Sequence, residues 1–253
     1  MELGLTGKVA LVTGGSEGIG KATARVLVRE GAKVAICARR EDVLQRAVSE
    51  LGNDVLGVRC DVTVPGDVTS LIAQVIARFG RLDVLVNNAG TAAAGRFEDL
   101  GDDAWAADLD LKLYGAVRTI RAALPHLKRD GGRIINITTP AGKHPAAGSL
   151  PTSVSRAAGI ALTKALSKEL AGDRVLVNTV CVGLIKSAQQ ERHGAQRGLS
   201  PAQHYDALGR SVPLARVGEA NEVANVIAFL ASEAASYVTG ASINVDGGSS
   251  AVV

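Results

Sequence analysis

The chain has 253 residues, of which 47% are hydrophobic, and its 28 basic and 25 acidic residues give a formal net charge of +3. This length suits one domain with a single large core better than two independent domains. The nearly balanced charge, the lack of a basic block and an aromatic content of 3% exclude the electrostatic and stacking features of a nucleic-acid binder. We therefore expect a small molecule as the partner, and no nucleic acid.

Two features of the sequence address the cellular compartment. The start, MELGLTGKVALVTGG, lacks a basic region followed by an apolar run and a small-residue cleavage site, and Gly or a charge interrupts every later apolar run before about 18 residues. Cys37, Cys60 and Cys181 lie in or at the end of β-branched apolar runs, without CxxC or metal-ligand spacing. The sequence thus predicts a cytoplasmic protein with buried reduced thiols, no membrane segment and no metal site.

Seven short β-rich runs alternate with segments of helical periodicity. The runs are almost continuously apolar, as expected for parallel strands that helices cover on both faces. This alternation predicts a single α/β domain over residues 1–253, built as a doubly wound parallel sheet of seven strands. The expected strands are KVALVT (8–13), KVAICA (33–38), DVLGVRC (54–60), LDVLVNN (82–88), GRIINIT (132–138), RVLVNTV (174–180) and ASINV (241–245).

The interval of about 184–212, after the sixth expected strand, is more polar than the rest and weakly periodic. In an open α/β sheet, a long insertion after the carboxyl end of a strand lies over the ligand crevice. We expect this interval to form a mobile substrate lid. Its His193, His204 and Tyr205 would reach a substrate only when the lid closes.

A glycine-rich loop, TGGSEGIGKATARVLVREGA, follows the first expected strand. Gly14, Gly18 and Gly20 permit a tight turn and close backbone approach, and the free amides at the start of the next helix attract a pyrophosphate. Residues 15–21 also read G-xxxx-G-K, as in nucleotide triphosphatases. However, Ala22 lies where that motif needs Ser or Thr for magnesium. The loop therefore favours a dinucleotide.

Three further motifs accompany the glycine loop: Asp-Val at 61–62 closes the third strand, NNAG at 87–90 the fourth, and VDGG at 245–248 the last. Together with TGxxxGIG, GRIINIT and VNTVCVG, they resemble the short-chain dehydrogenase/reductase family over essentially the whole chain. The resemblance implies a Rossmann-type fold and an NAD(P)-dependent oxidoreductase acting on a carbonyl or hydroxyl group. It also implies a homotetramer that associates through the helices around 105–127 and 152–170 and the C-terminal strand.

The resemblance also implies a set of cofactor-binding residues. Asp61 would touch the adenine, and Ile185 and Ser187 would meet the nicotinamide carboxamide. Val182 stands where the family usually has proline, a departure that would loosen the entry to the lid. The full set is Gly14, Ser16, Gly18, Ile19, Gly20, Arg39, Arg40, Asp61, Val62, Asn87, Ala89, Gly90, Arg156, Gly183, Ile185 and Ser187.

The end of the second strand addresses the choice of cofactor. An acid there binds a ribose 2′-hydroxyl, whereas arginine suits a 2′-phosphate. The sequence has Arg39 and Arg40 and no acid at this place, which predicts NADP, with NAD as the alternative. Both arginines can instead cap a solvated helix start, and Glu17 is placed to neutralise one of them.

Members of the family usually reduce a carbonyl with a Tyr-x-x-x-Lys pair, helped by an upstream serine and by an asparagine on the preceding helix. Alignment on AAGIALTKAL (157–166) puts Thr152 at the tyrosine, Arg156 at the lysine, Thr139 at the serine and Lys112 at the asparagine. No tyrosine of the chain is followed by lysine four residues later. The sequence therefore predicts a non-standard proton donor.

The chemistry of these four residue types differs. Thr139 keeps a hydroxyl that can polarise an oxygen. Arg156 keeps a positive charge, but a guanidinium is ordinarily too weak an acid to relay protons. The aliphatic hydroxyl of Thr152 is a far weaker acid than a phenol with a pKa of about 10. Lys112, if desolvated, can serve as acid or base; alternatively it is a surface lysine that pairs with Asp108.

A second candidate proton donor is His144, in the loop TTPAGKHPAAG on the side where the family lines its substrate pocket. The alternative is a solvated loop histidine. Three functions remain open: an NADP-dependent oxidoreductase with a substituted proton donor, a non-redox dehydratase, isomerase or cyclase of the same fold, and a non-catalytic cofactor-binding subunit.

Overall fold

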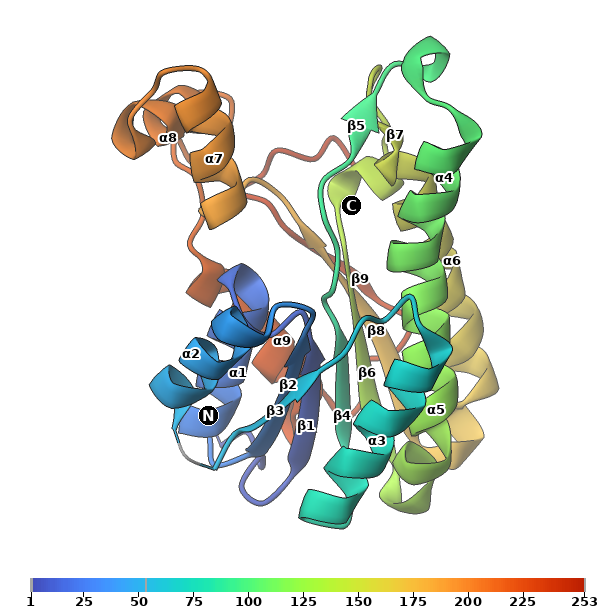
Figure 1. Ribbon diagram of the computed structural model, residues 1–253. Helices are drawn as coiled ribbons and strands as arrows, with labels where there is room; N and C mark the ends of the chain where they lie inside the picture. The colour runs from blue at the N-terminus through green and yellow to red at the C-terminus, as the bar shows by residue number, and fades with distance from the viewer. Residues whose placement is uncertain (1, 53, 253) are drawn as a thin grey trace.

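The computed structural model describes residues 2–52 and 54–252, so positions 1, 53 and 253 of the expected domain lie outside the described residues. Within them, seven parallel strands form one sheet in the order β3-β2-β1-β4-β6-β8-β9, which confirms the predicted Rossmann-type fold (Figure 1). The strands are β1 (Val9–Thr13), β2 (Lys33–Ala38), β3 (Leu56–Arg59), β4 (Val84–Asn87), β6 (Gly132–Thr138), β8 (Val175–Val182) and β9 (Ser242–Val245).

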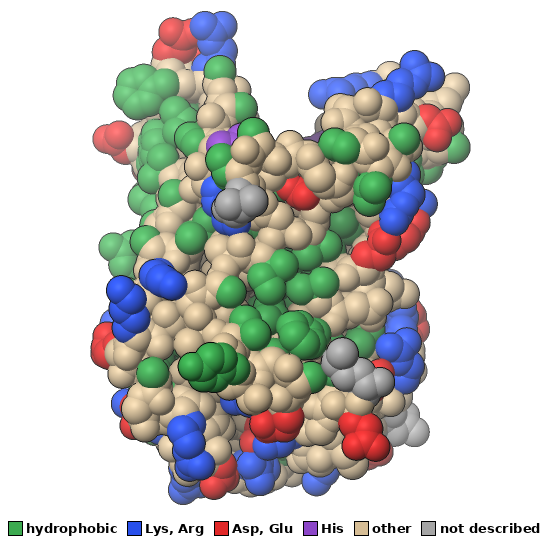
Figure 2. All heavy atoms as spheres, turned by 180° about the vertical axis from the view of Figure 1, so that it is seen from behind, with side chains coloured by type: hydrophobic (Ala, Val, Ile, Leu, Met, Phe, Trp, Pro, Cys, Tyr) green, Lys and Arg blue, Asp and Glu red, His purple; other side chains and the backbone are tan. Residues whose placement is uncertain are grey.

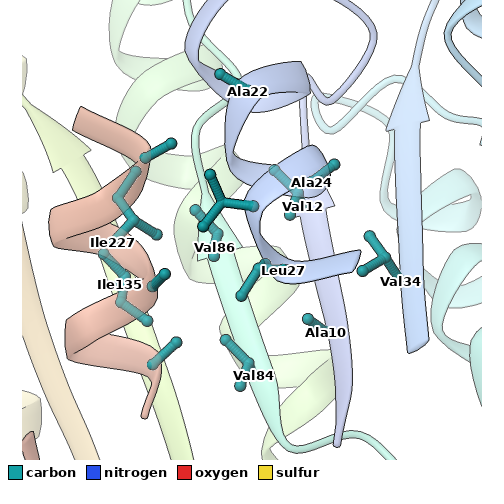
Figure 3. Packing of buried hydrophobic residues seen from close by; sticks show 14 of the residues in the cluster. Ala10, Val12, Ala22, Ala24, Leu27, Val34, Val84, Val86, Ile135 and Ile227 are labelled. Atoms are coloured by element: carbon teal, nitrogen blue, oxygen red, sulfur yellow. The ribbon is translucent and has the colours of Figure 1, made fainter. Parts of the chain in front are cut away.

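Helices cover both faces of this sheet (Figure 1). One face carries α1 (Gly18–Arg29), α2 (Glu41–Leu51) and α9 (Ala220–Ala231), and the other carries α3 (Pro65–Phe79), α5 (Gly115–Asp130) and α6 (Thr152–Glu169). In Figure 3, Leu27 of α1 and Ile227 of α9 lie around Val86 of β4, and all three are wholly buried. Burying each such side chain contributes about 1.5–3 kcal/mol, so this layer holds the sheet in place.

Several short elements extend beyond the carboxyl ends of the strands. The antiparallel pair β5 (Ala94–Gly95) and β7 (Leu150–Pro151), which the sequence did not predict, lies there with α4 (Asp102–Leu109). A π-helical turn, η2 (Asp110–Tyr114), joins α4 to α5. The remaining short turns are η1 (Phe97–Asp99), η3 (Pro140–Gly142), η4 (Ala171–Asp173) and η5 (Glu233–Ala235).

The interval expected as a lid forms two helices, α7 (Ala188–Gln196) and α8 (Pro201–Gly209). They project beside the strand ends, opposite β5, β7 and α4 (Figure 1). Weak periodicity left these helices unpredicted, because each is short and packs mainly against the other. Ser200 begins α8 with a capping box that includes Gln203.

The structure bears on the predicted state of the cysteines and on the predicted lack of a membrane segment. Cys37, Cys60 and Cys181 are buried and free of disulfide bonds, as predicted. No helix among the described residues is long and apolar enough to cross a bilayer.

Candidate active site

A cleft of about 790 Å³ opens at the carboxyl ends of the strands. From behind, Figure 2 shows a notch at this end of the molecule, between the projection of α7 and α8 and that of β5, β7 and α4. The lining brings together residues of the glycine loop, the ends of the strands, the start of α6 and the start of α7. Predicted cofactor residues on it are Gly14, Ser16, Gly18, Ile19, Arg39, Arg40, Asp61, Val62, Ala89, Gly90, Arg156, Gly183, Ile185 and Ser187.

Two predicted cofactor residues lie elsewhere. Asn87 lines a separate cavity of about 20 Å³ behind the cleft, and its side chain donates to Asn136 Oδ1 at 2.9 Å. Gly20 packs against the glycine loop, where a Cβ would lie 2.3 Å from the carbonyl oxygen of Gly14. Asn87 and Gly20 therefore support the structure around the cleft without lining it.

The glycine loop is held by the neighbouring strand β4, through a residue that the sequence analysis missed. The side-chain amide of Asn88 donates to the carbonyl oxygens of Thr13 and Gly14 at 2.9 and 3.1 Å. The backbone amides of Asn88 and Ala89 both donate to Thr13 Oγ1 at 3.0 Å. Gly14, with a φ of +64°, adopts the turn that these bonds require. The loop is thus fixed with α1 directly behind it.

Both arginines at the end of β2 have acidic neighbours. Arg40 pairs with Glu17, as the sequence placed it to do, and Arg39 lies 3.9 Å from Asp61. The side chains of both arginines are about 60% exposed, so these ion pairs contribute little to stability. Each guanidinium remains accessible to an anion in the cleft.

Three of the four predicted catalytic positions face the cleft: Thr139, Thr152 and Arg156. Thr139 follows β6, whereas Thr152 and Arg156 lie one turn apart at the start of α6. The hydroxyl oxygen of Thr139 is buried and has no hydrogen-bond partner among the described residues. A polar atom of this kind is costly unless a ligand or water satisfies it.

Arg156 is held deep in the site. Its Nη1 donates to the carbonyl oxygen of Ile137 at 2.8 Å, while its buried Nε lacks a partner within the described part of the chain. A Cβ on Gly90 would lie 2.8 Å from its Nη2, so glycine there makes room for the guanidinium. Burial lowers the pKa of Arg156 to about 10, which leaves it charged at neutral pH.

The fourth position, Lys112, is not a surface lysine. Its side chain is fully buried in the π-helical turn and lines the small cavity instead of the cleft. Its ammonium pairs with Asp108, one turn earlier, and donates to Thr152 Oγ1 at 2.6 Å. The pairing with Asp108 is therefore confirmed, whereas the solvent-exposed position is wrong because α6 packs over this side chain.

Asp108 completes this buried network, and the sequence analysis considered it only as a partner for a surface lysine. Its other carboxylate oxygen accepts a hydrogen bond from Ser155 Oγ of α6 at 2.6 Å. Burial lowers the pKa of Lys112, and the hydrogen bond from Lys112 to Asp108 opposes that shift. The nearby charge of Arg156 lowers it further.

The other candidate proton donors lie outside the cleft lining. His144 lines neither cavity, and the neighbouring Lys143 turns away to donate to Ser242 O and Asn244 Oδ1 at 2.8 and 2.7 Å. The role of His144 as a proton donor therefore stays a prediction, without a contact to the cleft that supports it. No metal-ligand cluster occurs among the described residues.

The polar side chains of the expected lid hold its two helices together. Nε2 of the buried His204 lies 3.3 Å from Gln190 Oε1. The hydroxyl of Tyr205 accepts from the backbone amide of Ser187 at 3.2 Å. Gln190 also lines the cleft, as does Arg192 of α7.

The fold and this cleft define a Rossmann-fold protein with a ligand site at the carboxyl edge of its sheet. The sequence profile of the family described as enoyl-(acyl carrier protein) reductase matches residues 14–250. A putative ketoacyl reductase of Streptomyces coelicolor is 36% identical over 251 residues, which cover 95% of this chain and 96% of that protein. The chain belongs to the short-chain dehydrogenase/reductase family.

Solved structures agree with this assignment. A short-chain oxidoreductase of Pseudomonas aeruginosa PAO1, described as containing an atypical catalytic center, superposes with a TM-score of 0.94 at 35% identity over 99% of this chain and 100% of that one. A variant of actinorhodin polyketide ketoreductase with NADPH superposes with a TM-score of 0.90 at 35% identity, covering 97% and 98% of the two chains.

The buried ion pair generates a stability prediction. Lys112→Met and Asp108→Asn each leave one buried charge without its partner, which should cost about 3–5 kcal/mol of unfolding free energy. The double variant should cost clearly less than the sum, because it leaves neither charge behind. Urea unfolding measures all three.

A matched control is the exposed pair Lys128–Asp173, whose side chains are each 40% exposed. Lys128→Met with Asp173→Asn should change stability by less than about 1 kcal/mol. Additive losses for Lys112 and Asp108 would contradict their direct coupling.

Proposed function

We propose that the protein is an NADP-dependent oxidoreductase that transfers a hydride between a nicotinamide cofactor and a carbonyl or hydroxyl group of a small molecule. The observation that carries this proposal is the single cleft surface shared by the glycine loop, Thr139, Thr152 and Arg156. The ketoacyl reductase name of one relative and the NADPH in the ketoreductase structure support it.

The cleft fits a dinucleotide. Its volume of about 790 Å³ is that of an extended ligand site, and the backbone of the glycine loop lies open to it. In the proposed complex the loop amides and the start of α1 bind the pyrophosphate, Asp61 and Val62 contact the adenine, and Arg39 and Arg40 bind the 2′-phosphate. At the other end the unpartnered Nε of Arg156 is available to a ribose hydroxyl, and Ile185 and Ser187 are placed for the carboxamide. The reduced nicotinamide supplies the hydride.

The proton donor in this proposal is non-standard. The family's usual tyrosine, lysine, serine and asparagine are replaced by Thr152, Arg156, Thr139 and Lys112. The atypical catalytic center described for the Pseudomonas aeruginosa oxidoreductase supports the idea that a chain of this family tolerates such replacement. His144 has less support as the donor, since it is absent from the lining of the cleft.

The alternative functions find less support. A non-redox enzyme or a non-catalytic subunit would retain the same fold, but the relatives named above carry reductase or oxidoreductase names. The lid role of residues 184–212 is part of the proposal, because Ser187, Gln190 and Arg192 line the cleft. A small-molecule substrate without nucleic-acid or membrane partners, and a cytoplasmic location, stay predictions.

The proposed function predicts NADPH oxidation. Calorimetric titration should give NADPH binding, and a panel of 3-oxoacyl thioesters, simple ketones and keto sugars should contain a compound that consumes NADPH and yields the alcohol. Absorbance of the reduced nicotinamide, together with product analysis, measures this. Binding without turnover would favour a non-catalytic subunit, and a product formed without nicotinamide oxidation would favour a non-redox enzyme.

A second prediction concerns cofactor choice. Arg39→Ala removes a charged donor proposed to contact the 2′-phosphate, so NADP affinity should fall about tenfold or more while NAD affinity changes much less. Calorimetry with both cofactors measures the difference. Arg46→Ala is the control, since Arg46 lies on α2, pairs with Asp42 and is absent from the cleft lining. Equal losses for the two cofactors would remove the argument for NADP.

We also propose a homotetramer. Large apolar side chains are left exposed on or next to the segments expected to associate: Tyr114 at the end of η2, Val154 on α6 and Tyr237 before β9. Light scattering should give a mass about four times that of the 25.9 kDa chain. The mass of a single chain would contradict this expectation.

A further inference from the structure

We infer that Lys112 and Thr152 form a proton relay, in which the ammonium of Lys112 is the proton source and the hydroxyl of Thr152 delivers the proton to the substrate oxygen. This inference rests on the proposed carbonyl reduction and names the group that replaces the missing phenol. Its basis is the arrangement of four side chains: Lys112, Asp108, Thr152 and Thr139.

Lys112 has access to the cleft only through Thr152. The side chain of Lys112 is 0% exposed and lines only the small cavity, so it does not touch a molecule in the cleft. Thr152 lines the cleft itself, and its Oγ1 lies 2.6 Å from Lys112 Nζ. A proton that leaves Lys112 toward the cleft therefore passes through the hydroxyl of Thr152.

The hydrogen bonds of Thr152 allow its hydroxyl to pass on a proton. Its Oγ1 accepts from Lys112 and from the backbone amide of Ala93, the latter at 3.3 Å. Its single proton points to the carbonyl oxygen of Ala93, and Asp108 Oδ1 lies 3.5 Å away as a second acceptor. An oxygen that gains negative charge in the cleft is a stronger acceptor than a neutral carbonyl, so rotation of the hydroxyl toward it is favoured.

The unpartnered hydroxyl of Thr139 suggests where the substrate oxygen would bind. Thr139 Oγ1 is buried on the same cleft wall and has no partner among the described residues. A carbonyl oxygen bound between Thr139 and Thr152 would satisfy this hydroxyl and receive two donors. Donors aimed at the position where charge develops are the usual means of stabilising such a transition state.

In the direction of reduction, the carbonyl carbon accepts the hydride and the C=O π pair moves to oxygen. The O–H bond of Thr152 breaks as the O–H bond of the alcohol forms, and an N–H bond of Lys112 breaks as its proton moves to Thr152 Oγ1. Lys112 ends neutral beside the Asp108 carboxylate. After the alcohol leaves, a water molecule in the cleft returns a proton to Lys112 through Thr152, and the hydroxide that remains leaves to the bulk solvent.

The acid strength of Lys112 is suited to this role. An ammonium has an ordinary pKa of about 10.4, close to the value of about 10 for the phenol that the family uses. The charged groups facing Lys112 are Asp108 on α4 and Arg156 on α6. Asp108, itself held by Ser155, is a positioning residue that aims the ammonium at Thr152.

The test compares Thr152→Val, which keeps the shape without the hydroxyl, with Thr152→Ser, which restores it. Thr152→Val should lower kcat about 10²–10⁴-fold with unchanged NADPH affinity by calorimetry, and Thr152→Ser should recover most of the rate. Lys112→Met should cause a similar loss, and the double variant should be no worse than either single one, because the two groups act as a unit. Ser153→Ala is the control, since its buried hydroxyl has no partner among the described residues and should leave kcat unchanged.

A pH profile separates the relay from a structural role. The wild-type rate of reduction should fall as rising pH deprotonates Lys112, and this limb should vanish in Lys112→Met. Arg156 also faces the site and has a pKa of about 10, so its deprotonation could also lower the rate at high pH. Loss of this limb in Lys112→Met would assign the limb to Lys112 rather than to Arg156. In cofactor-free protein, the lysine Nζ NMR signal that Lys112→Met removes should titrate below about 10.4.

The outcomes distinguish the two proposals. Wild-type protein that binds NADPH but reduces no carbonyl overturns the proposed function and the relay with it. An active wild-type enzyme together with an equally active Thr152→Val variant overturns the relay alone. A loss in Lys112→Met that is fully additive with the loss in Thr152→Val also contradicts it.

Discussion

The buried ion pair of Lys112 and Asp108 constrains the whole site. Removing two charges from water costs several kcal/mol per ion, and their attraction offsets this only with good geometry and further hydrogen bonds. Those bonds come from α6, where Thr152 accepts from Lys112 and Ser155 donates to Asp108. The chain therefore keeps this pair only if α4, the π-helical turn and α6 stay docked.

This docking divides the site into two layers. Thr139, Thr152 and Arg156 form the layer that faces the cleft, and Lys112 with Asp108 forms a buried layer behind it. Thr152 and Arg156 are four residues apart on one helix and so share a face. The π-helical turn places Lys112 behind that face, and such turns occur frequently at functional sites. The proposed chemistry depends on contact between the two layers through Thr152.

Most of the fold follows from local sequence patterns, since buried parallel strands are nearly continuous apolar runs. GRIINIT, for example, is β6 from its first residue to its last, whereas β8 continues to Val182 beyond its expected end. The two-residue strands β5 and β7 carry no pattern of their own, because their pairing depends on segments about fifty residues apart. The helices α7 and α8 were missed because their apolar faces are small.

The candidate site was likewise predicted where local motifs define it and missed where contacts between distant segments define it. The glycine loop and the motifs at the strand ends predicted most of the cleft lining, because each lies next to a recognisable strand. The spacing of Asp108 and Lys112 indicated that they pair, but their burial depends on α6, which lies more than forty residues later. Asn88 and Ser155 were missed for a related reason: each acts through contacts with an element distant in the sequence.

In the proposed mechanism the substrate oxygen binds between the hydroxyls of Thr139 and Thr152, with Lys112 behind Thr152. A crystal structure of the protein with oxidised cofactor and an unreactive amide or ketone analogue tests this most directly. The ligand oxygen should lie within about 2.6–3.2 Å of both Thr139 Oγ1 and Thr152 Oγ1. Thr152 should retain its contact with Lys112 in that complex. A ligand oxygen bound away from both hydroxyls, or a Lys112 turned out into the cleft to contact it directly, would rule out this mechanism.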